Sequence, residues 1–351
     1  MTTHVEHKPI AITMGDAAGI GPEIIAKAYL QRPDLLQDCF VWGDVGSMRR
    51  AFRQVQPGGV PYPVAQIASP QDLTEVPPHC VPVLQAGDAL PELPMGRVHA
   101  VAGAFAGRCV MQAAEAAIRG DVAALVTAPL HKEALHAAGT PFDQFPGHTE
   151  MLQAVAAGHL GRPVSEVPVR MMLANDELRT VLVSIHVSLR EAIAAVTVEN
   201  VLQTLLITHA SLGRVLRRAP RMAVAGLNPH AGEGGLFGRE ELDVIVPAMQ
   251  MARAQGCLLS GPWAPDTVFM RARKKLGLDA EFDVVVAMYH DQGLIPVKYL
   301  GVEKGVNVTL GLPLVRTSPD HGTAFDIAGR GIADPSSLIE AVRMARALLT
   351  S

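Results

Sequence analysis

Short apolar segments alternate along this chain with longer stretches of helical periodicity. The clearest candidate strands are PIAITMG (9–15), VAALVTAP (122–129), RTVLVSIH (179–186), RMAVAGLN (221–228) and FDVVVAMYH (282–290). Helical spacing predicts helices over 21–31, 106–120, 197–214, 239–256 and 335–350. This alternation is typical of an α/β protein with a largely parallel sheet.

The length and composition of the chain fit two domains of this class. At 351 residues it exceeds one ordinary domain, and the segment AGTPFDQFPGHTE interrupts the pattern near a boundary at 125–150. A composition that is 49% hydrophobic and 18% charged can fill a large aliphatic core and argues against disorder. The Pro-rich segment 57–94 predicts short strands and loops.

Charge, cysteine usage and hydropathy exclude several functional classes. The net charge of −4, without clustered Lys and Arg among aromatics, argues against nucleic-acid binding. The four cysteines are far apart and form no CxxC pair, which indicates free thiols in a reducing compartment. We see no signal peptide and no apolar run of the roughly 18–20 residues that span a membrane. We therefore expect a soluble, cytoplasmic protein.

Histidines follow three of the predicted strands. His186 ends one strand, His230 closely follows another, and His290 ends a third. Ligands of open parallel sheets bind beyond the carboxyl ends of the strands, so these side chains could meet there. Three neutral imidazoles suit a divalent metal and leave positions open for a substrate. Any one of them could instead be a hydrogen-bonded structural ring, and no compact HExxH pair is present.

Glycine-rich and basic segments point to a small anionic ligand. GDAAGIGPE (15–23) follows a strand and opens a helix, as a phosphate-binding turn would, although neither G-x-G-x-x-G nor a Walker A sequence is present. NPHAGEGGLFGREE (228–241) is either part of a site or only a conformationally demanding loop. Cationic and polar side chains from Lys298 to Arg316 suit a phosphate or carboxylate. The stretch PGHTEM (146–151) could bind an anion or cap a helix.

Taken together, the motifs resemble those of the 4-hydroxythreonine-4-phosphate dehydrogenase family. The matching segments are ITMGDAAGIGPE, TAPLHK, GHTE, GLNPHAGEGG, PDTVF, MYHDQGLIPVKY, GVNVTLGLP and RTSPDHGTAFDIAGRG, in the family's order. The resemblance implies two α/β/α domains with a cleft between them, as in isocitrate and isopropylmalate dehydrogenases, which bind NAD without G-x-G-x-x-G. It implies a first domain at 1–130 plus 308–351. It places the metal ligands and dimer contacts in a second domain at 131–307.

The resemblance also implies roles for individual residues. One divalent metal ion (zinc, magnesium or cobalt) per active site is expected, shared across a homodimer and held by His186, His230 and His290. The implied substrate-binding residues are His148, Thr149, Lys298, Asn307 and Arg316. The implied catalytic residues are Lys298, Asp291 and Asp266, and NAD(P) is expected to contact Leu310 and Gly311.

The implied reaction belongs to pyridoxine biosynthesis. It is the NAD(P)-dependent oxidation of 4-phosphooxy-L-threonine at its 3-hydroxyl, followed by decarboxylation to 3-amino-2-oxopropyl phosphate. The chain departs from the biosynthetic members of the family at DQF before PGHTE and at MGDAAG. The forms YHDQGLIPVKY and AFDIA resemble those of relatives that oxidise D-threonate or D-erythronate 4-phosphate. The retained GHTE, Lys298, Asn307 and Arg316 favour a phosphorylated substrate over a terephthalate cis-dihydrodiol. A three-histidine metal hydrolase and a catalytically silent relative remain further alternatives.

Overall fold

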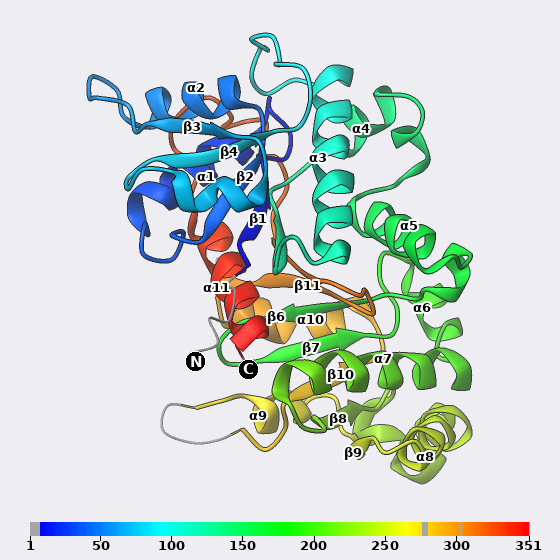
Figure 1. The fold of residues 1–351 in the computed structure, drawn as a ribbon. Helices are drawn as coiled ribbons and strands as arrows, with labels where there is room; N and C mark the ends of the chain where they lie inside the picture. Colours follow the sequence, from blue (N-terminus) through cyan, green and yellow to red (C-terminus); the bar gives the residue numbers. More distant parts are fainter. Residues whose placement is uncertain (1–7, 276–279, 302–303, 351) are drawn as a thin grey trace, which may run out of the picture. The chain divides into compact units, whose positions relative to one another are not determined.

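The computed structural model describes residues 8–275, 280–301 and 304–350, which form two compact units. The first unit contains the chain up to Pro168 together with Leu312–Leu349, and the second contains Val169–Gly311. Residues 131–168 group with the first unit, whereas the sequence-based boundaries assign them to the second domain. Each unit combines a β-sheet with packed helices (Figure 1), so the predicted α/β class is confirmed.

The strands of the first unit run parallel to one another, in the order β3–β4–β2–β1–β5–β12. They are β1 (Ile10–Thr13), β2 (Cys39–Gly43), β3 (Val64–Ile67), β4 (Val81–Gln85), β5 (Ala124–Thr127) and β12 (Val315–Pro319). The register pairs Thr13 with Thr127, and Thr317 with Val126. The carboxyl ends of β1, β5 and β12 therefore lie next to one another at one edge of the sheet.

Helices pack around these strands. They are α1 (Gly21–Gln31), α2 (Val45–Val55), α3 (Ala100–Arg119), α4 (Lys132–Ala137), α5 (His148–Leu160) and α11 (Ser336–Thr350), with 3-10 turns η1 (Pro70–Glu75), η2 (Phe142–Gln144) and η3 (Val164–Glu166). Asp44 caps α2, because its Oδ2 accepts a hydrogen bond of 2.6 Å from the Ser47 amide. α3 ends at Gly120, whose φ of 81° is accessible to glycine at little cost. α11 is tied to β12 by the Thr317 hydroxyl, which donates to the Ala341 carbonyl at 2.8 Å.

The second unit has one antiparallel strand among otherwise parallel ones, in the order β11–β6–β7–β10–β8–β9. The strands are β6 (Arg170–Ala174), β7 (Arg179–Leu182), β8 (Arg221–Ala225), β9 (Leu258–Trp263), β10 (Val284–Ala287) and β11 (Val306–Leu310). β6 pairs antiparallel with both β11 and β7. The side chain of Asn175 holds the turn between β6 and β7, accepting from the Glu177 and Leu178 amides at 2.9 and 2.8 Å.

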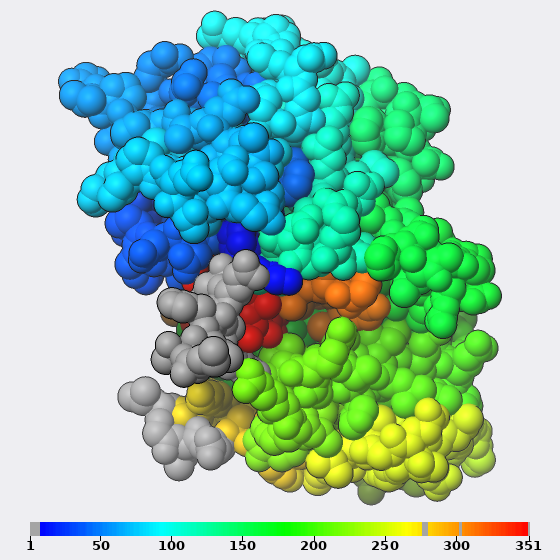
Figure 2. All heavy atoms as spheres, in the orientation of Figure 1, coloured from blue at the N-terminus to red at the C-terminus, as the bar shows by residue number. Residues whose placement is uncertain are grey.

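Helices lie on both sides of this second sheet. They are α6 (Leu189–Ala194), α7 (Val198–Leu216), α8 (Val246–Ala254), α9 (Val268–Ala272) and α10 (His290–Tyr299), together with the turns η4 (Pro229–Gly235) and η5 (Glu241–Ile245). In Figure 1, α7 lies in front of the strands and α10 behind them, and Figure 2 shows α8 at the surface. A Cβ at Gly293 would lie 2.4 Å from Cδ2 of Leu182, so the glycine lets α10 approach the sheet closely.

The predicted elements match the observed ones best where local signals are strong. α1 spans 21–31 as predicted, with Pro22 in its first turn. The predicted helix 239–256 is instead a π-helical turn, Glu241–Ile245, followed by α8. The strands β7 and β10 end earlier than predicted, so His186 and His290 lie beyond the strands. Within the described part of the chain, none of the helices has the length and apolar character needed to cross a membrane.

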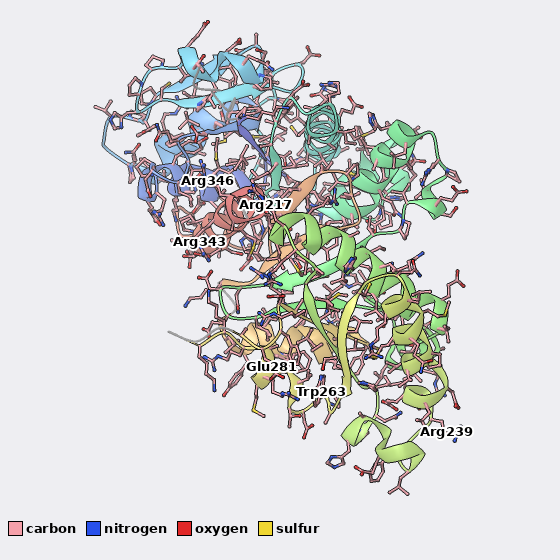
Figure 3. All side chains as sticks on the ribbon, turned by 60° about the horizontal axis from the view of Figure 1, so that its bottom comes forward. Arg217, Arg239, Trp263, Glu281, Arg343 and Arg346 are labelled. Atoms are coloured by element: carbon pink, nitrogen blue, oxygen red, sulfur yellow. The ribbon has the colours of Figure 1, made fainter. Side chains whose placement is uncertain are left out.

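The edge strand β9 is anchored by Arg271. Its guanidinium carbon lies 3.7 Å from the ring centroid of Trp263, and its nitrogens donate to Glu281. Trp263 and Glu281 are labelled in Figure 3. A cation stacked on an aromatic ring and also paired with a carboxylate restrains both partners. The contact therefore fixes the segment after β9, which contains Asp266.

Candidate functional site

Two of the predicted metal ligands meet at the carboxyl ends of neighbouring strands in the second unit. β7 and β10 run parallel and adjacent, with Leu182 opposite Ala287. His186 follows β7 and His290 begins α10, and their ring centroids are 5.6 Å apart with planes inclined by 46°. His186 has a left-handed backbone with φ of 52°, an uncommon conformation for a residue with a side chain. Such local strain is often found at functional sites.

Asp291 contacts the ring of its neighbour His290. Asp291 Oδ1 lies 2.7 Å from Nδ1 of His290. In the tautomer that has the proton on Nδ1, the ring donates to the carboxylate and leaves Nε2 as the lone-pair donor. Histidines that bind metals commonly make this second hydrogen bond, which orients the ring and increases its basicity. Asp291 thus lies where its carboxylate can orient the ring of His290.

The third predicted ligand, His230, lies in an unusual turn. Residues 230–234 all have positive φ, from 42° at Glu233 to 79° at Gly232. The His230 ring lies 6.0 Å from the ring of Phe237. Over the described residues, no three His, Cys, Asp or Glu side chains are grouped closely enough to hold a metal. Within one chain, His230 thus does not join His186 and His290.

The donor chemistry of the pair fits a divalent transition metal. Two imidazoles with adjacent rings, one backed by a carboxylate, are suitable ligands for zinc or cobalt and less so for magnesium, which prefers oxygen. A third ligand would complete the usual set for a catalytic metal and leave a position for substrate. His186 and His290 would hold such an ion, and the third ligand would have to come from elsewhere.

Three further predicted residues also lie in the second unit. Lys298 is on α10, eight residues after His290 and half-buried. Asn307 is on β11 opposite Leu173 of β6. Asp266 lies between β9 and α9 and is exposed. Each of these side chains is thus held by regular structure or by the anchored segment after β9.

The predicted NAD(P) contacts lie where β11 ends. The Leu310 side chain is buried in the core, and the Gly311 amide donates to the Ser211 hydroxyl at 3.2 Å. Gly311 has a φ of 93°, so the chain turns there in a conformation that favours glycine. Any cofactor contact at this point would involve the backbone and not the buried Leu310 side chain.

In the first unit, a buried arginine near the start of β12 directs its guanidinium to Thr127, the last residue of β5. Arg316 is 6% exposed, and its Nε and Nη2 donate to the Thr127 hydroxyl at 3.2 and 2.7 Å. Burial lowers the pKa of the Arg316 guanidinium to about 10, and the charge of Glu150 partly offsets this. A buried guanidinium of this kind is well suited to bind a phosphate or carboxylate.

His148 is close to this arginine, at the first position of α5. Burial, with a smaller effect from the charge of Arg316, lowers the pKa of His148 well below its usual value. The ring is therefore neutral, and its enclosed Nε2 has no hydrogen-bond partner among the described residues. Thr149 follows it in the first turn, where helix amides attract anions. The structure thus groups three predicted residues, His148, Thr149 and Arg316, in the first unit.

Several amides of the glycine-containing turn GDAAGIGPE are already bonded. The amide of Asp16 donates to the Pro129 carbonyl, that of Ala18 to the Asp16 carboxylate, and that of Ile20 to the Thr323 carbonyl. The Asp16 and Ile20 amides thus join the turn to distant loops. These three donors are not available to a phosphate.

The same turn contains a residue that was not recognised as a site candidate. Asp16 is fully buried, and its Oδ2 has no hydrogen-bond partner among the described residues. Burial raises the pKa of Asp16, while the Ala18 amide and the charges of His131 and His99 lower it. Enclosed atoms without partners also include Thr13 Oγ1 and His131 Nδ1, from segments at the same sheet edge. Buried polar atoms in this state commonly contact a ligand or ordered water.

Comparison with known proteins identifies the family. The family model described as pyridoxal phosphate biosynthetic protein PdxA matches residues 36–345. A 4-hydroxythreonine-4-phosphate dehydrogenase from Beijerinckia indica is 52% identical over 335 residues, which is 94% of this chain and 92% of that protein. A D-threonate 4-phosphate dehydrogenase from Salmonella typhimurium is 43% identical over 98% of this chain and its own full length.

A solved structure agrees with these matches. The structure of 4-hydroxythreonine-4-phosphate dehydrogenase from Klebsiella pneumoniae superimposes with a TM-score of 0.86 at 38% identity, covering 99% of this chain and 100% of that one. The family match, the relatives and the solved structure all extend over most or nearly all of the chain. The chain therefore belongs to the PdxA family of pyridoxal phosphate biosynthetic proteins.

Proposed function

We propose that this protein oxidises 4-phosphooxy-L-threonine at its 3-hydroxyl with NAD(P)+ and then releases carbon dioxide to form 3-amino-2-oxopropyl phosphate. The observation that carries the proposal is the pair His186–His290 with Asp291 behind it, at the ends of adjacent strands. The most similar relative described above acts, by its name, on 4-hydroxythreonine 4-phosphate. The chain is accordingly a dehydrogenase that acts on a CH–OH group.

The residues present support both parts of this reaction. When bound, a divalent metal supplies a Lewis acid that lowers the pKa of a substrate hydroxyl, and NAD(P)+ accepts a hydride. We infer that His186 and His290 hold the metal while Asp291 keeps His290 in the required orientation. Oxidation gives a β-keto acid, which loses its carboxylate as carbon dioxide. We assign Lys298, on α10, to hold the phosphate or to deliver the proton that replaces the carboxylate.

The first unit contains a candidate anion site. Arg316 provides a buried positive charge, and the helix amides and hydroxyl at Thr149 can add hydrogen bonds. A phosphate or carboxylate would neutralise the buried guanidinium. We assign Asn307 and Asp266 to substrate contacts on the strength of the motifs, and Leu310 and Gly311 to the cofactor.

We further propose that two copies share each metal site. Among the residues that the structure describes, no third His, Cys, Asp or Glu of the same subunit joins His186 and His290 in a metal-binding group. His230 is flanked by exposed apolar side chains, with Leu236 74% and Phe237 49% exposed. An exposed apolar patch of this kind is typical of a protein interface. In a twofold dimer, His230 of each subunit would complete the site of the other.

A second substrate is favoured by a specific observation. The Salmonella typhimurium relative is named for D-threonate 4-phosphate and matches nearly the whole chain. That compound has the same phosphate and 3-hydroxyl, and carries a hydroxyl where 4-phosphooxy-L-threonine carries an amine. The sites described above, which would bind the phosphate and the reacting hydroxyl, suit both compounds.

The test is NADH formation with 4-phosphooxy-L-threonine, D-threonate 4-phosphate and D-erythronate 4-phosphate, using metal-replete and chelated protein. We expect the highest kcat/KM with the first compound, and loss of activity on chelation that zinc or cobalt restores. Faster turnover of a sugar acid would change the assigned substrate. Absence of NADH with all three compounds and both nucleotides would refute the dehydrogenase.

A further inference from the structure

Gln292, in the segment HDQG, has a buried side-chain amide that bonds the backbone near two of the proposed metal ligands. Its Oε1 accepts a hydrogen bond of 2.7 Å from the Met288 amide, and its Nε2 donates to the Gly226 carbonyl at 2.8 Å. Both atoms of one side chain are thus used to join two separate strand ends. Replacing such a group leaves buried backbone donors and acceptors unpaired.

The two strand ends that Gln292 joins both lead to predicted metal ligands. Met288 lies two residues before His290, and Gly226 lies four residues before His230. The ladder between β10 and β8 has its last paired residues at Val286 and Val224. Beyond that pair the strands enter different loops, and the Gln292 amide provides the connection between them.

Ser184 links the third histidine-bearing segment to the same point. Ser184 lies two residues before His186, and its hydroxyl donates to the Met288 carbonyl at 3.1 Å. The Met288 amide is therefore linked through Gln292 to the end of β8, and the Met288 carbonyl is bonded to Ser184, which follows β7. All three segments that carry His186, His230 and His290 are fixed relative to Met288.

Glu241 holds the far end of this network. Its Oε1 accepts from the amides of Leu227 and Asn228 at 2.7 and 2.8 Å, directly after the carbonyl that Gln292 contacts. The loop that leads to His230 is thus restrained from both sides. The Gln292 amide and the Glu241 carboxylate thus bond the two ends of one peptide group, between Gly226 and Leu227, and the carboxylate also bonds the next peptide group.

We propose that Gln292 is a positioning residue for the histidine metal site, because its amide fixes the turn of His290 relative to the loop of His230. The inference rests on the proposed function, in which these histidines bind a divalent metal. In the proposed dimer each Gln292 affects two sites, since His290 serves one site and His230 the other. Loss of the amide would displace the imidazoles and weaken metal binding without removing any ligand.

The test compares Gln292→Met with Asn175→Leu in the full-length protein. Met and Leu approximate the shapes of Gln and Asn but cannot form the amide's hydrogen bonds. Asn175 is a suitable control because its buried amide also donates to α10, at the Val297 carbonyl at 3.2 Å, but seven residues after His290 and without a hydrogen bond to Met288 or Gly226. Zinc affinity is measured by competition with a chromophoric chelator. The visible spectrum of the cobalt form and the thermal stability of the metal-free form are recorded for each protein.

We expect both variants to lose stability, whereas only Gln292→Met binds zinc about 10- to 100-fold more weakly, as for other groups that orient metal ligands. Its cobalt spectrum should also differ from that of the wild type. Ser184→Ala, a smaller change that the fold will tolerate, should weaken zinc binding several-fold.

Wild-type zinc affinity and an unchanged cobalt spectrum in both Gln292→Met and Ser184→Ala would overturn the inference while leaving the metal site intact. If Gln292→Met does not fold, the Ser184→Ala result decides. Failure of the wild-type protein itself to bind zinc or cobalt would refute the proposed metal site together with the inference.

Discussion

The two carboxyl oxygens of Asp16 have different surroundings. Oδ1 accepts a hydrogen bond of 2.8 Å from the Ala18 amide, while the enclosed Oδ2 has no hydrogen-bond partner among the described residues. Burial raises the pKa of Asp16 above its usual 3.8. The folded protein therefore keeps this proton at pH values where the unfolded chain has released it. The stability contributed by this group falls as the pH rises from about 4 through the raised pKa.

We predict that Asp16→Asn is more stable than the wild type at pH 7, because an amide keeps the Oδ1 contact and has no charge to bury. The gain should shrink as the pH falls through the raised pKa and vanish below the usual 3.8, where the wild-type carboxyl is protonated in both states. Chemical unfolding at several pH values measures this difference. A difference that does not vary with pH would contradict the buried-charge explanation.

The sequence identified some of the site residues more easily than others. His186 and His290 were predicted as candidates because a histidine that follows an apolar strand is visible in the sequence, and their proximity follows from parallel pairing of β7 with β10. Asp16 and Gln292 were not found, because their roles depend on Pro129 and Gly226, which are distant in the chain. A buried polar side chain can only be interpreted when its partners are known.

At the level of elements, the turn η4 stands out for its backbone. His230, Ala231 and Glu233 have side chains but adopt left-handed conformations with φ between 42° and 52°. Each such residue costs roughly 1–2 kcal/mol relative to a right-handed one. The sequence around it supplies glycines at 232, 234 and 235, which tolerate this conformation.

We predict that Ala231→Gly stabilises the protein by about 0.5–1 kcal/mol. Glycine removes the steric cost of the left-handed backbone in the folded state. It also increases the conformational entropy of the unfolded chain, but this destabilising effect is smaller than the steric gain. The matched control is Ala117→Gly in α3, where the backbone is helical and a loss of about 0.5–1 kcal/mol is expected. The midpoint of urea unfolding measures both. Equal destabilisation by the two substitutions would show that η4 is not strained.

Local signals explain which elements were predicted well. α1 begins at Gly21 with Pro22 behind it, a start signal contained in adjacent residues. The antiparallel direction of β6 was missed, because strand direction depends on the partners β7 and β11. The π-helical turn within the predicted helix 239–256 was also missed, because Glu241 is held by the amides of Leu227 and Asn228 and not by a local sequence signal.

At the level of the whole molecule, the proposed dimer makes a quantitative prediction. His230→Ala and His290→Ala should each abolish turnover alone. In a heterodimer of the two, one site has all three histidines and the other has one. An equal mixture after subunit exchange should therefore recover about a quarter of wild-type activity, since half the dimers are mixed and each has one intact site.

Native mass spectrometry with differently tagged subunits verifies that the mixed dimers form. A mixture of two preparations of His290→Ala serves as the control and should remain inactive. Mixed dimers without activity would contradict sharing of the histidines between subunits.

The order in which the chain is synthesised has a consequence for the first unit. Residues 169–311 form a continuous segment, whereas the first unit needs β12 from the far end of the chain. A ribosome that has made residue 311 has completed the second unit but has not yet made Arg316, the partner of Thr127. Domains generally fold as units as they emerge. We therefore expect the anion site of His148 and Arg316 to form last, after the strands that support the histidine-bearing loops of the second unit have folded.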